Sequence, residues 1–242
     1  MSSPVVIYEK KSSVAQITLN RPEKINAYNI EMRDELYQIL EAVRDDTEVR
    51  SVLIRGEGER GFCSGADLSE FGTSPSQSVA RRVRFERDIW KLWLNIPKPM
   101  VCALHGFVIG SGIEMALLCD FRIAAHGTIF ALPETGLGML PAAGGTQTLS
   151  RTIGTNKALE VLYTNRHFTA EEALSWGLIN QLIPSQDLIP KANDLARYLA
   201  SLNQHALSAI KQAVLSGIEM QLTQGLDLEK RLALQVAANS EV

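Results

Sequence analysis

Residues 105–147 read HGFVIGSGIEMALLCDFRIAAHGTIFALPETGLGMLPAAGGTQ and hold two glutamates, Glu114 and Glu134, among mostly apolar neighbours. A Gly-Ser-Gly segment at 110–112 opens a hydrophobic run at 113–119 that only Glu114 interrupts. Small residues that open an apolar helix leave its first backbone N–H groups without partners, and those groups favour an anion or an oxyanion in front of them. The stretch therefore predicts a helix start with a carboxylate beside an anion-binding turn.

Glu114 also has an ordinary explanation, because a glutamate in the first helical turn often only complements the helix dipole. Its apolar neighbours, however, cover every side of the helix and leave no polar face for a solvated side chain: Ile113, Met115, Leu117 and Leu118. Burying a carboxylate is costly. Glu134 follows another apolar core segment, so its carboxylate is expected to carry the same cost. We therefore interpret both glutamates as functional.

The composition narrows the class of protein. The chain has 242 residues, a length that suits one large domain or one and a half small ones. Its formal net charge is −3, which gives no reason to expect nucleic acid or an anionic membrane as a partner. The apolar runs around 101–119 are interrupted by His105, by glycines and by Glu114, so we expect no membrane span. The N-terminus lacks a secretory or transit pattern, and a cytoplasmic location is the default expectation.

The three cysteines, Cys63, Cys102 and Cys119, lie among apolar residues and are predicted to be reduced, buried thiols. Their spacing suits no zinc site, and no metal site is expected. A catalytic Cys63 is conceivable, but no histidine lies near it in sequence, so core packing is favoured. His105 and His126 have no Ser or Cys partner placed for a triad.

Hydrophobic periodicity predicts a mixed α/β order of elements that ends in a helical third. The expected elements are a hairpin of 5–7 and 14–19, a helix over 32–43, a strand over 51–55, a helix over 78–95, strands before 110, at 121–124 and at 128–131, a helix over 156–163, a capping box at 169–172, a strand over 179–183, and three helical stretches from 186 onwards. The arginines in the 78–95 helix are interpreted as a solvated face. The Gly- and Ser-rich loop 56–77 fits a ligand-binding loop and an ordinary surface turn equally well.

Five segments then resemble one family in their order and spacing. They are LNRPEKINA at 19–27, FCSGADLSE at 62–70, HGFVIGSGIEMALLCDFRIAA at 105–125, FALPETGLGMLPAAGGTQTL at 130–149 and TAEEALSWGLIN at 169–180. Together they resemble the crotonase, or enoyl-CoA hydratase/isomerase, superfamily, and within it the enoyl-CoA hydratases most closely. The resemblance covers essentially the whole chain.

The resemblance implies an α/β fold, a crotonase-like spiral of ββα units with two near-perpendicular sheets and a helical C-terminal trimerisation region. We expect the spiral core at 1–185 and the helical region at 186–242, with the family's final helix absent. A homotrimer or a hexamer made of two trimers is implied. The substrate implied is an acyl-CoA thioester, and no separate cofactor is expected because coenzyme A is part of the substrate.

Carried over position by position, the resemblance puts an oxyanion hole at the backbone N–H groups of Ala66 and Ser111. Ser111 departs from the family's usual glycine, but a main-chain donor survives that change. Glu114 would activate water and Glu134 would protonate the α-carbon. The implied CoA-binding residues are Lys24, Ala27, Gly65, Ala66, Asp67, Leu68, Gly110 and Ser111.

Several alternatives stay open on the sequence. Lys24 is either a candidate for phosphate contact or a solvated turn residue. Asp67 is a candidate either to line the pantetheine path or to cap the next turn. Hydration is favoured because adding water needs one group to take a proton and another to give one. An isomerase that uses Glu134 alone, or a catalytically silent scaffold, remains possible in view of Ser111, Ala142 and the short C-terminus.

Overall fold

The structure is a computed structural model that describes residues 3–70 and 87–240. Its larger sheet has the strand order β1 (Val6–Lys11), β2 (Val14–Leu19), β3 (Ser51–Gly56), β5 (Met100–Leu104), β7 (Phe121–Ala125) and β10 (Gln181–Ile183). β1 and β2 pair antiparallel, as the sequence predicts, and every other neighbouring pair in this sheet is parallel. Parallel neighbours need long crossover connections, and these carry the remaining elements.

A smaller sheet holds β4 (Gly61–Cys63), β6 (Phe107–Ile109), β8 (Ile129–Ala131) and β9 (Phe168–Thr169). Each of β4, β6 and β8 directly follows a strand of the larger sheet, so successive turns of the chain add one strand to each sheet. The helix α4 (Ser111–Leu117) follows β6. The expected α/β fold with two sheets is confirmed, and both sheets are mostly parallel.

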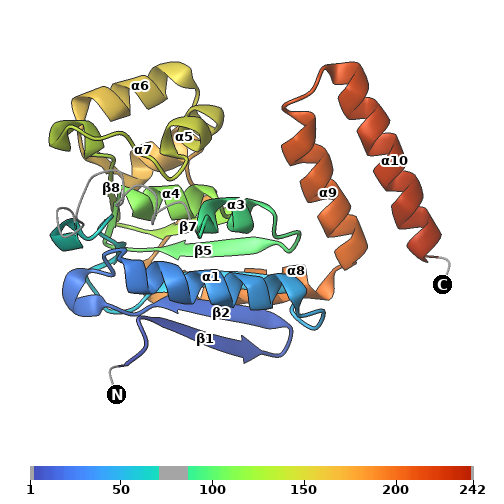
Figure 1. Cartoon of the computed structure of the whole chain (residues 1–242), viewed down its shortest axis with the longest axis horizontal. Helices are drawn as coiled ribbons and strands as arrows, with labels where there is room; N and C mark the ends of the chain where they lie inside the picture. The colour runs from blue at the N-terminus through green and yellow to red at the C-terminus, as the bar shows by residue number, and fades with distance from the viewer. Residues whose placement is uncertain (1–2, 71–86, 241–242) are drawn as a thin grey trace.

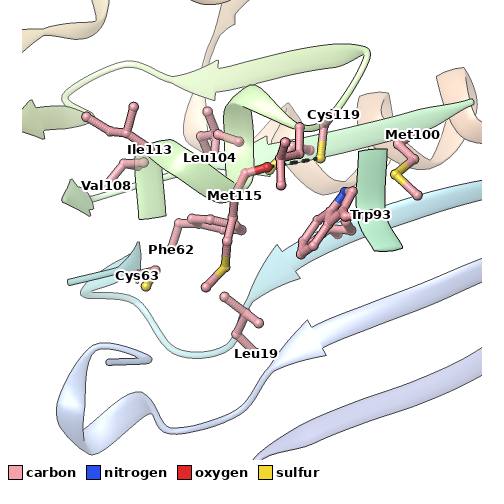
Figure 2. Packing of buried hydrophobic residues seen from close by; sticks show 14 of the residues in the cluster. Leu19, Phe62, Cys63, Trp93, Met100, Leu104, Val108, Ile113, Met115 and Cys119 are labelled. Carbon is pink, nitrogen blue, oxygen red and sulfur yellow. Dashed lines mark hydrogen bonds between the residues drawn. The ribbon is translucent and has the colours of Figure 1, made fainter. Parts of the chain in front are cut away.

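The core lies on both faces of the larger sheet because its inner strands are buried at nearly every position. Val52 and Ile54 face α1 (Ile30–Asp45), while Leu53 faces α8 (Leu188–Ser201) on the opposite side. Side chains alternate between the faces of a strand, so a continuous apolar run serves two layers. Figure 2 shows the first layer, with Met115 reaching from α4 toward Leu19.

The first long helix forms where the pattern predicts it. Asn29 caps α1 by accepting the N–H of Met32 through its side chain, and apolar residues at helical spacing are fully buried below it: Met32, Leu36, Leu40 and Val43. Of the helix expected at 78–95, only α3 (Ile89–Leu94) and its flanks fall within the described residues. Short 3₁₀ turns occupy Pro22–Lys24 (η1), Leu68–Glu70 (η2), Glu134–Leu137 (η3) and Ser185–Asp187 (η4).

The second half of the chain is mostly helical, with α5 (Gly145–Ile153), α6 (Thr155–Thr164) and α7 (Ala170–Ser175) before β10. The capping box predicted at the start of α7 is confirmed, since Thr169 and Glu172 exchange both hydrogen bonds. β10 is shorter than the expected strand and begins at Gln181, because Leu178 and Ile179 instead bury their side chains against the core.

Two long helices, α9 (Gln204–Gly217) and α10 (Leu222–Ser240), form a hairpin that stands to one side of the body (Figure 1). Lys211 pairs with Asp120 at 2.9 Å and Glu219 pairs with Arg151 at 2.8 Å, and these contacts tie α9 to the core. None of the helices in the described part of the chain is both long and apolar enough to span a bilayer.

Candidate active site

The site is built around the turn from β6 into α4. Gly110 makes this turn with φ of +51°, and its carbonyl accepts the N–H groups of Ile113 and Glu114. A Cβ placed on Gly110 would lie 2.6 Å from Glu134 Oε1 and 3.6 Å from Gly65 Cα. The positive φ and the approach of Glu134 Oε1 both favour a glycine at this position. Three segments that are far apart in sequence therefore meet at the start of α4.

Ser111 is the first residue of α4 and is 2% exposed. As expected for a residue in the first helical turn, its N–H has no acceptor within the helix. No other group among the described residues accepts it either. This N–H is available as a donor at the turn.

The second predicted donor, Ala66, lies in a short parallel bridge with Tyr28. Tyr28 N donates to the Gly65 carbonyl and Asp67 N donates to the Tyr28 carbonyl, each at 2.8 Å. In a parallel pairing, the residue between these two bonds turns its own N–H away from the partner strand. No acceptor within residues 3–70 and 87–240 takes the Ala66 N–H. The two amides predicted as donors thus lie on adjoining segments.

Glu114 is buried, at 2% exposure, and it is not left in purely apolar surroundings. Its Oε1 accepts the backbone N–H groups of Ala143 and Gly145, both at 2.9 Å. Hydrogen bonds to a charged acceptor are worth more than neutral ones, and they offset much of the cost of burying the carboxylate. The loop before α5 therefore holds this side chain in one orientation.

Glu134 opens η3 immediately after β8 and Leu132–Pro133. Its side chain is partly buried, and Oε2 is shielded from solvent. Its Oε1 lies beside Gly110, 2.6 Å from the position that a Cβ on that residue would take. Glu114 and Glu134 thus both lie at the first turn of α4, one on the helix and the other reaching it from a separate segment.

Asp67 points into its own loop. Its carboxylate accepts the Ser69 hydroxyl at 2.6 Å, the Ser69 N–H at 3.1 Å and the Arg21 guanidinium at 2.9 Å. The hydrogen bond from the Ser69 hydroxyl, followed by that from Arg21, lowers the pKa of the Asp67 carboxyl. The sequence left open whether Asp67 lines a pantetheine path or caps a turn, and this carboxylate makes the capping contacts.

The other residues expected at the CoA end surround this loop. Ala27 is buried and Leu68 is 53% exposed, while Lys24 is exposed and its carbonyl accepts the Ser64 hydroxyl at 3.0 Å. Arg21 was missed by the sequence reasoning, although it lies within the motif LNRPEKINA. A charged residue flanking a proline turn carries no sign of a partner 46 residues away.

The structure excludes Cys63 as a nucleophile. It is fully buried, and desolvation raises the pKa of its thiol to about 12, so the reactive thiolate is not populated at neutral pH. All three cysteines are buried and form no disulfide, as predicted. His105 contacts the Gly58 carbonyl, and His126 is exposed beside Glu171. Within the described residues, no group of three or more His, Cys, Asp or Glu side chains is placed to bind a metal.

Two carboxylates at the start of α4, and donor amides on α4 and on the adjoining loop, within a two-sheet spiral, are typical of one class of protein. The family model described as enoyl-CoA hydratase/isomerase matches residues 9–242, and the chain belongs to this family, as the sequence resemblance indicates. The short-chain-enoyl-CoA hydratase of Clostridium acetobutylicum is 35% identical over 196 residues, which cover 81% of this chain and 75% of that protein.

Another relative carries a different activity in its name. The 1,2-epoxyphenylacetyl-CoA isomerase of Escherichia coli K12 is 35% identical over 229 residues, which cover 93% of this chain and 87% of that protein. Among solved structures, the enoyl-CoA hydratase from Bacillus anthracis superposes with a TM-score of 0.92 at 34% identity, covering 97% of this chain and 91% of that one. The crotonase fold is therefore confirmed. Family membership leaves hydration and isomerisation to be separated by the site itself.

Proposed function

We propose that this chain is an enoyl-CoA hydratase, which adds water across the 2,3 double bond of an enoyl-CoA thioester to give a 3-hydroxyacyl-CoA. The proposal rests on one observation, that the carboxylates of Glu114 and Glu134 lie at the same helical turn as the donor N–H of Ser111. Hydration needs one group that accepts a proton and one that donates a proton. Relatives whose names include enoyl-CoA hydratase support it.

In the proposed reaction, Glu114 takes a proton from water as the water oxygen bonds to C3. The π electrons of the double bond move toward the thioester and form an enolate, whose oxygen accepts the N–H groups of Ala66 and Ser111. Glu134 then gives a proton to C2. Each donor to the developing oxyanion contributes about 10²–10³ in rate in comparable sites. Proton exchange with solvent returns both carboxyl groups to their starting states.

The CoA moiety is proposed to lie along the two loops that Arg21 and Tyr28 hold together. Lys24 is exposed on one of them and offers an ammonium to a phosphate, and Leu68 is exposed on the other. Gly65 and Gly110 let the backbone come close to the thioester. Coenzyme A enters as part of the substrate, and the proposal requires no further cofactor.

The proposal extends to a homotrimer or a hexamer of two trimers. The α9–α10 hairpin exposes a row of large apolar side chains, which are at least half exposed: Ile210, Val214, Ile218, Leu222, Leu226 and Leu234. An exposed apolar surface of this extent on a protruding hairpin is typical of a subunit contact. Light scattering should give a mass of three or six chains, and a monomer at micromolar concentration would contradict this assembly.

Double-bond isomerisation is the second candidate, and one relative is named an isomerase. It moves a proton between two carbons of the acyl chain, so Glu134 alone would suffice and Glu114 would be dispensable for chemistry. The presence of both acids at one turn favours hydration.

The test is turnover of purified protein on 2-enoyl-CoA thioesters that range from short linear to cyclic acyl groups. Hydration removes the conjugated double bond, so its near-ultraviolet absorbance should fall for at least one member of the panel. If the absorbance of every member stays constant while calorimetry shows that CoA binds, the proposed hydratase activity is wrong.

A further inference from the structure

Arg21 and Asp67 form a largely buried ion pair that joins two loops of the site. The guanidinium Nη2 lies 2.9 Å from Asp67 Oδ2, and the two side chains are 14% and 9% exposed. Arg21 Nη1 donates to the carbonyl of Ala27. One planar guanidinium therefore binds both loops, because its donors point in fixed, different directions.

These contacts surround the predicted oxyanion donor. Asp67 directly follows Ala66 in the chain, and Ala27 directly precedes Tyr28, whose backbone bonds on both sides of Ala66. The Arg21 guanidinium thus closes a ring of contacts that begins and ends at the Ala66 peptide. The direction of the Ala66 N–H is set within this ring.

The ring is anchored to the core through Asn26. Its side-chain oxygen accepts the N–H of Arg21 at 2.8 Å, and its side-chain nitrogen donates to the carbonyls of Glu57 and Gly61 at 3.0 and 3.1 Å. Asn26 is fully buried and has φ of +53°. Arg21 is therefore held at its backbone as well as at its guanidinium, next to the start of β4.

Both charged side chains are hydrogen-bonded to other groups of the protein. Asp67 Oδ1 accepts both the N–H and the hydroxyl of Ser69, and Oδ2 accepts Arg21. Arg21 gives its two terminal nitrogens to Asp67 and to the Ala27 carbonyl. These contacts already use both terminal nitrogens of Arg21 and both carboxylate oxygens of Asp67 to join the two loops, which favours a positioning role.

We propose that Arg21 and Asp67 are positioning residues that hold the Ala66 N–H in line with the thioester oxygen. The inference rests on the proposed function, because it takes Ala66 as an oxyanion donor. A donor that is misplaced by about 1 Å costs up to about 10²-fold in rate, somewhat less than removing it. Loss of the pair should therefore lower kcat and leave substrate binding nearly unchanged.

Two variants and a matched control test this. Asp67→Asn keeps an oxygen for Ser69 and weakens the bond to Arg21, whereas Arg21→Lys keeps the charge and cannot reach two acceptors at fixed angles. The control is Asp46→Asn, because Asp46 makes the same two kinds of contact as Asp67. Its carboxylate accepts a hydrogen bond from the Lys10 ammonium at 3.0 Å and another from the N–H of Glu48 at 2.9 Å. Asp46 follows the C-terminus of the 16-residue α1, about 24 Å along the helix from the site.

The readouts are thermal unfolding, kcat and KM, and the enolate fraction of bound 3-ketobutyryl-CoA measured by ultraviolet absorbance. The negative charge of its enolate is shared between the ketone oxygen and the thioester oxygen, so the probe reports the oxyanion hole without turnover. We expect Asp67→Asn and Arg21→Lys to stay folded, to lose about 10- to 10²-fold in kcat with KM within about threefold, and to bind less enolate. Asp46→Asn should match the wild type in kcat and in enolate.

Each of the other outcomes supports or overturns the positioning role of Arg21 and Asp67. Folded variants with unchanged kcat and unchanged enolate, or with a raised KM alone, overturn the positioning role. If the wild type enriches the enolate but hydrates no enoyl-CoA, the proposed hydration is wrong, and a lower enolate fraction in the variants still supports the positioning role. If the wild type does not enrich the enolate, Ala66 is not an oxyanion donor and the inference fails with it.

Discussion

Replacing Glu114 by Gln separates the catalytic role of this carboxylate from its structural one. Oε1 accepts the N–H groups of Ala143 and Gly145, both at 2.9 Å, and both donors need an acceptor. The glutamine in Glu114→Gln will therefore turn its carbonyl oxygen toward them and place its NH₂ group where Oε2 stood. An amide NH₂ cannot take a proton from water. The variant keeps the shape of the site and loses the base.

The expected magnitudes follow from these contacts. Loss of a general base lowers the hydration rate by about 10²–10⁴-fold, which is about 2.7–5.4 kcal/mol in the barrier. The two hydrogen bonds change from charged to neutral acceptors and lose about 1 kcal/mol each. Relief of the buried charge offsets part of that loss. With about 2–4 °C per kcal/mol for a chain of this size, Tm should fall by less than about 8 °C.

The assay follows the conjugated absorbance of a 2-enoyl-CoA for hydration, and its appearance from a 3-enoyl-CoA for isomerisation. The matched control is Glu35→Gln, because Glu35 also accepts a backbone N–H, that of Val6, at 2.7 Å, but lies on α1. Hydration should collapse in Glu114→Gln and persist in the control, while isomerisation by Glu134 should survive in both. A folded Glu114→Gln that hydrates within about threefold of the wild type would show that Glu114 only binds the two amides.

Further substitutions test Ser111, Gly145 and Asp67. Ser111→Gly keeps the main-chain donor and should retain turnover, whereas Ser111→Pro removes the N–H and should cost at least about 10²-fold in kcat. Gly145→Ala brings a Cβ to 2.9 Å from Glu114 Oε1 and should lower both kcat and Tm, by about 1–3 kcal/mol in stability. Its control, Gly217→Ala, meets open space on a helix and should not lower Tm. The depressed pKa of Asp67 implies stabilisation that is complete above about pH 3.9 and is lost as the pH falls further, so the Tm deficit of Asp67→Asn should shrink between pH 6 and pH 3.

Local patterns predicted the elements well where the chain carries its own signal. The helical spacing of Met32, Leu36 and Leu40 defines α1, and the pair Thr169 and Glu172 marks the start of α7. The signal for α1 comes from burial, because a repeating apolar face has to meet the core. The signal for α7 comes from the capping of its first backbone N–H groups. Half of the helix expected at 78–95 lies outside the described residues, and α3 is the helical part of the described half.

Such local patterns did not predict which groups bind the site residues. Glu114 is bound by amides 29 and 31 residues away, and any residue type except proline supplies an amide. Arg21 finds Asp67 across 46 residues. The family resemblance indicated which residues belong to the site, and the fold alone shows what orients them. The roles given to Glu114, Glu134, Ala66 and Ser111 stay predictions until the variants are measured.

Main-chain geometry, more than side-chain identity, holds this site together. A Cβ on Gly110 would lie 2.6 Å from Glu134 Oε1, and Gly145 lets the Glu114 carboxylate lie against the loop before α5. Both proposed oxyanion donors are backbone N–H groups. A serine at position 111 is therefore compatible with the proposed chemistry, because the substitution adds a side chain without removing a donor. Changes that move the backbone, as at Gly110 or Gly145, should be far more damaging than changes of the Ser111 side chain.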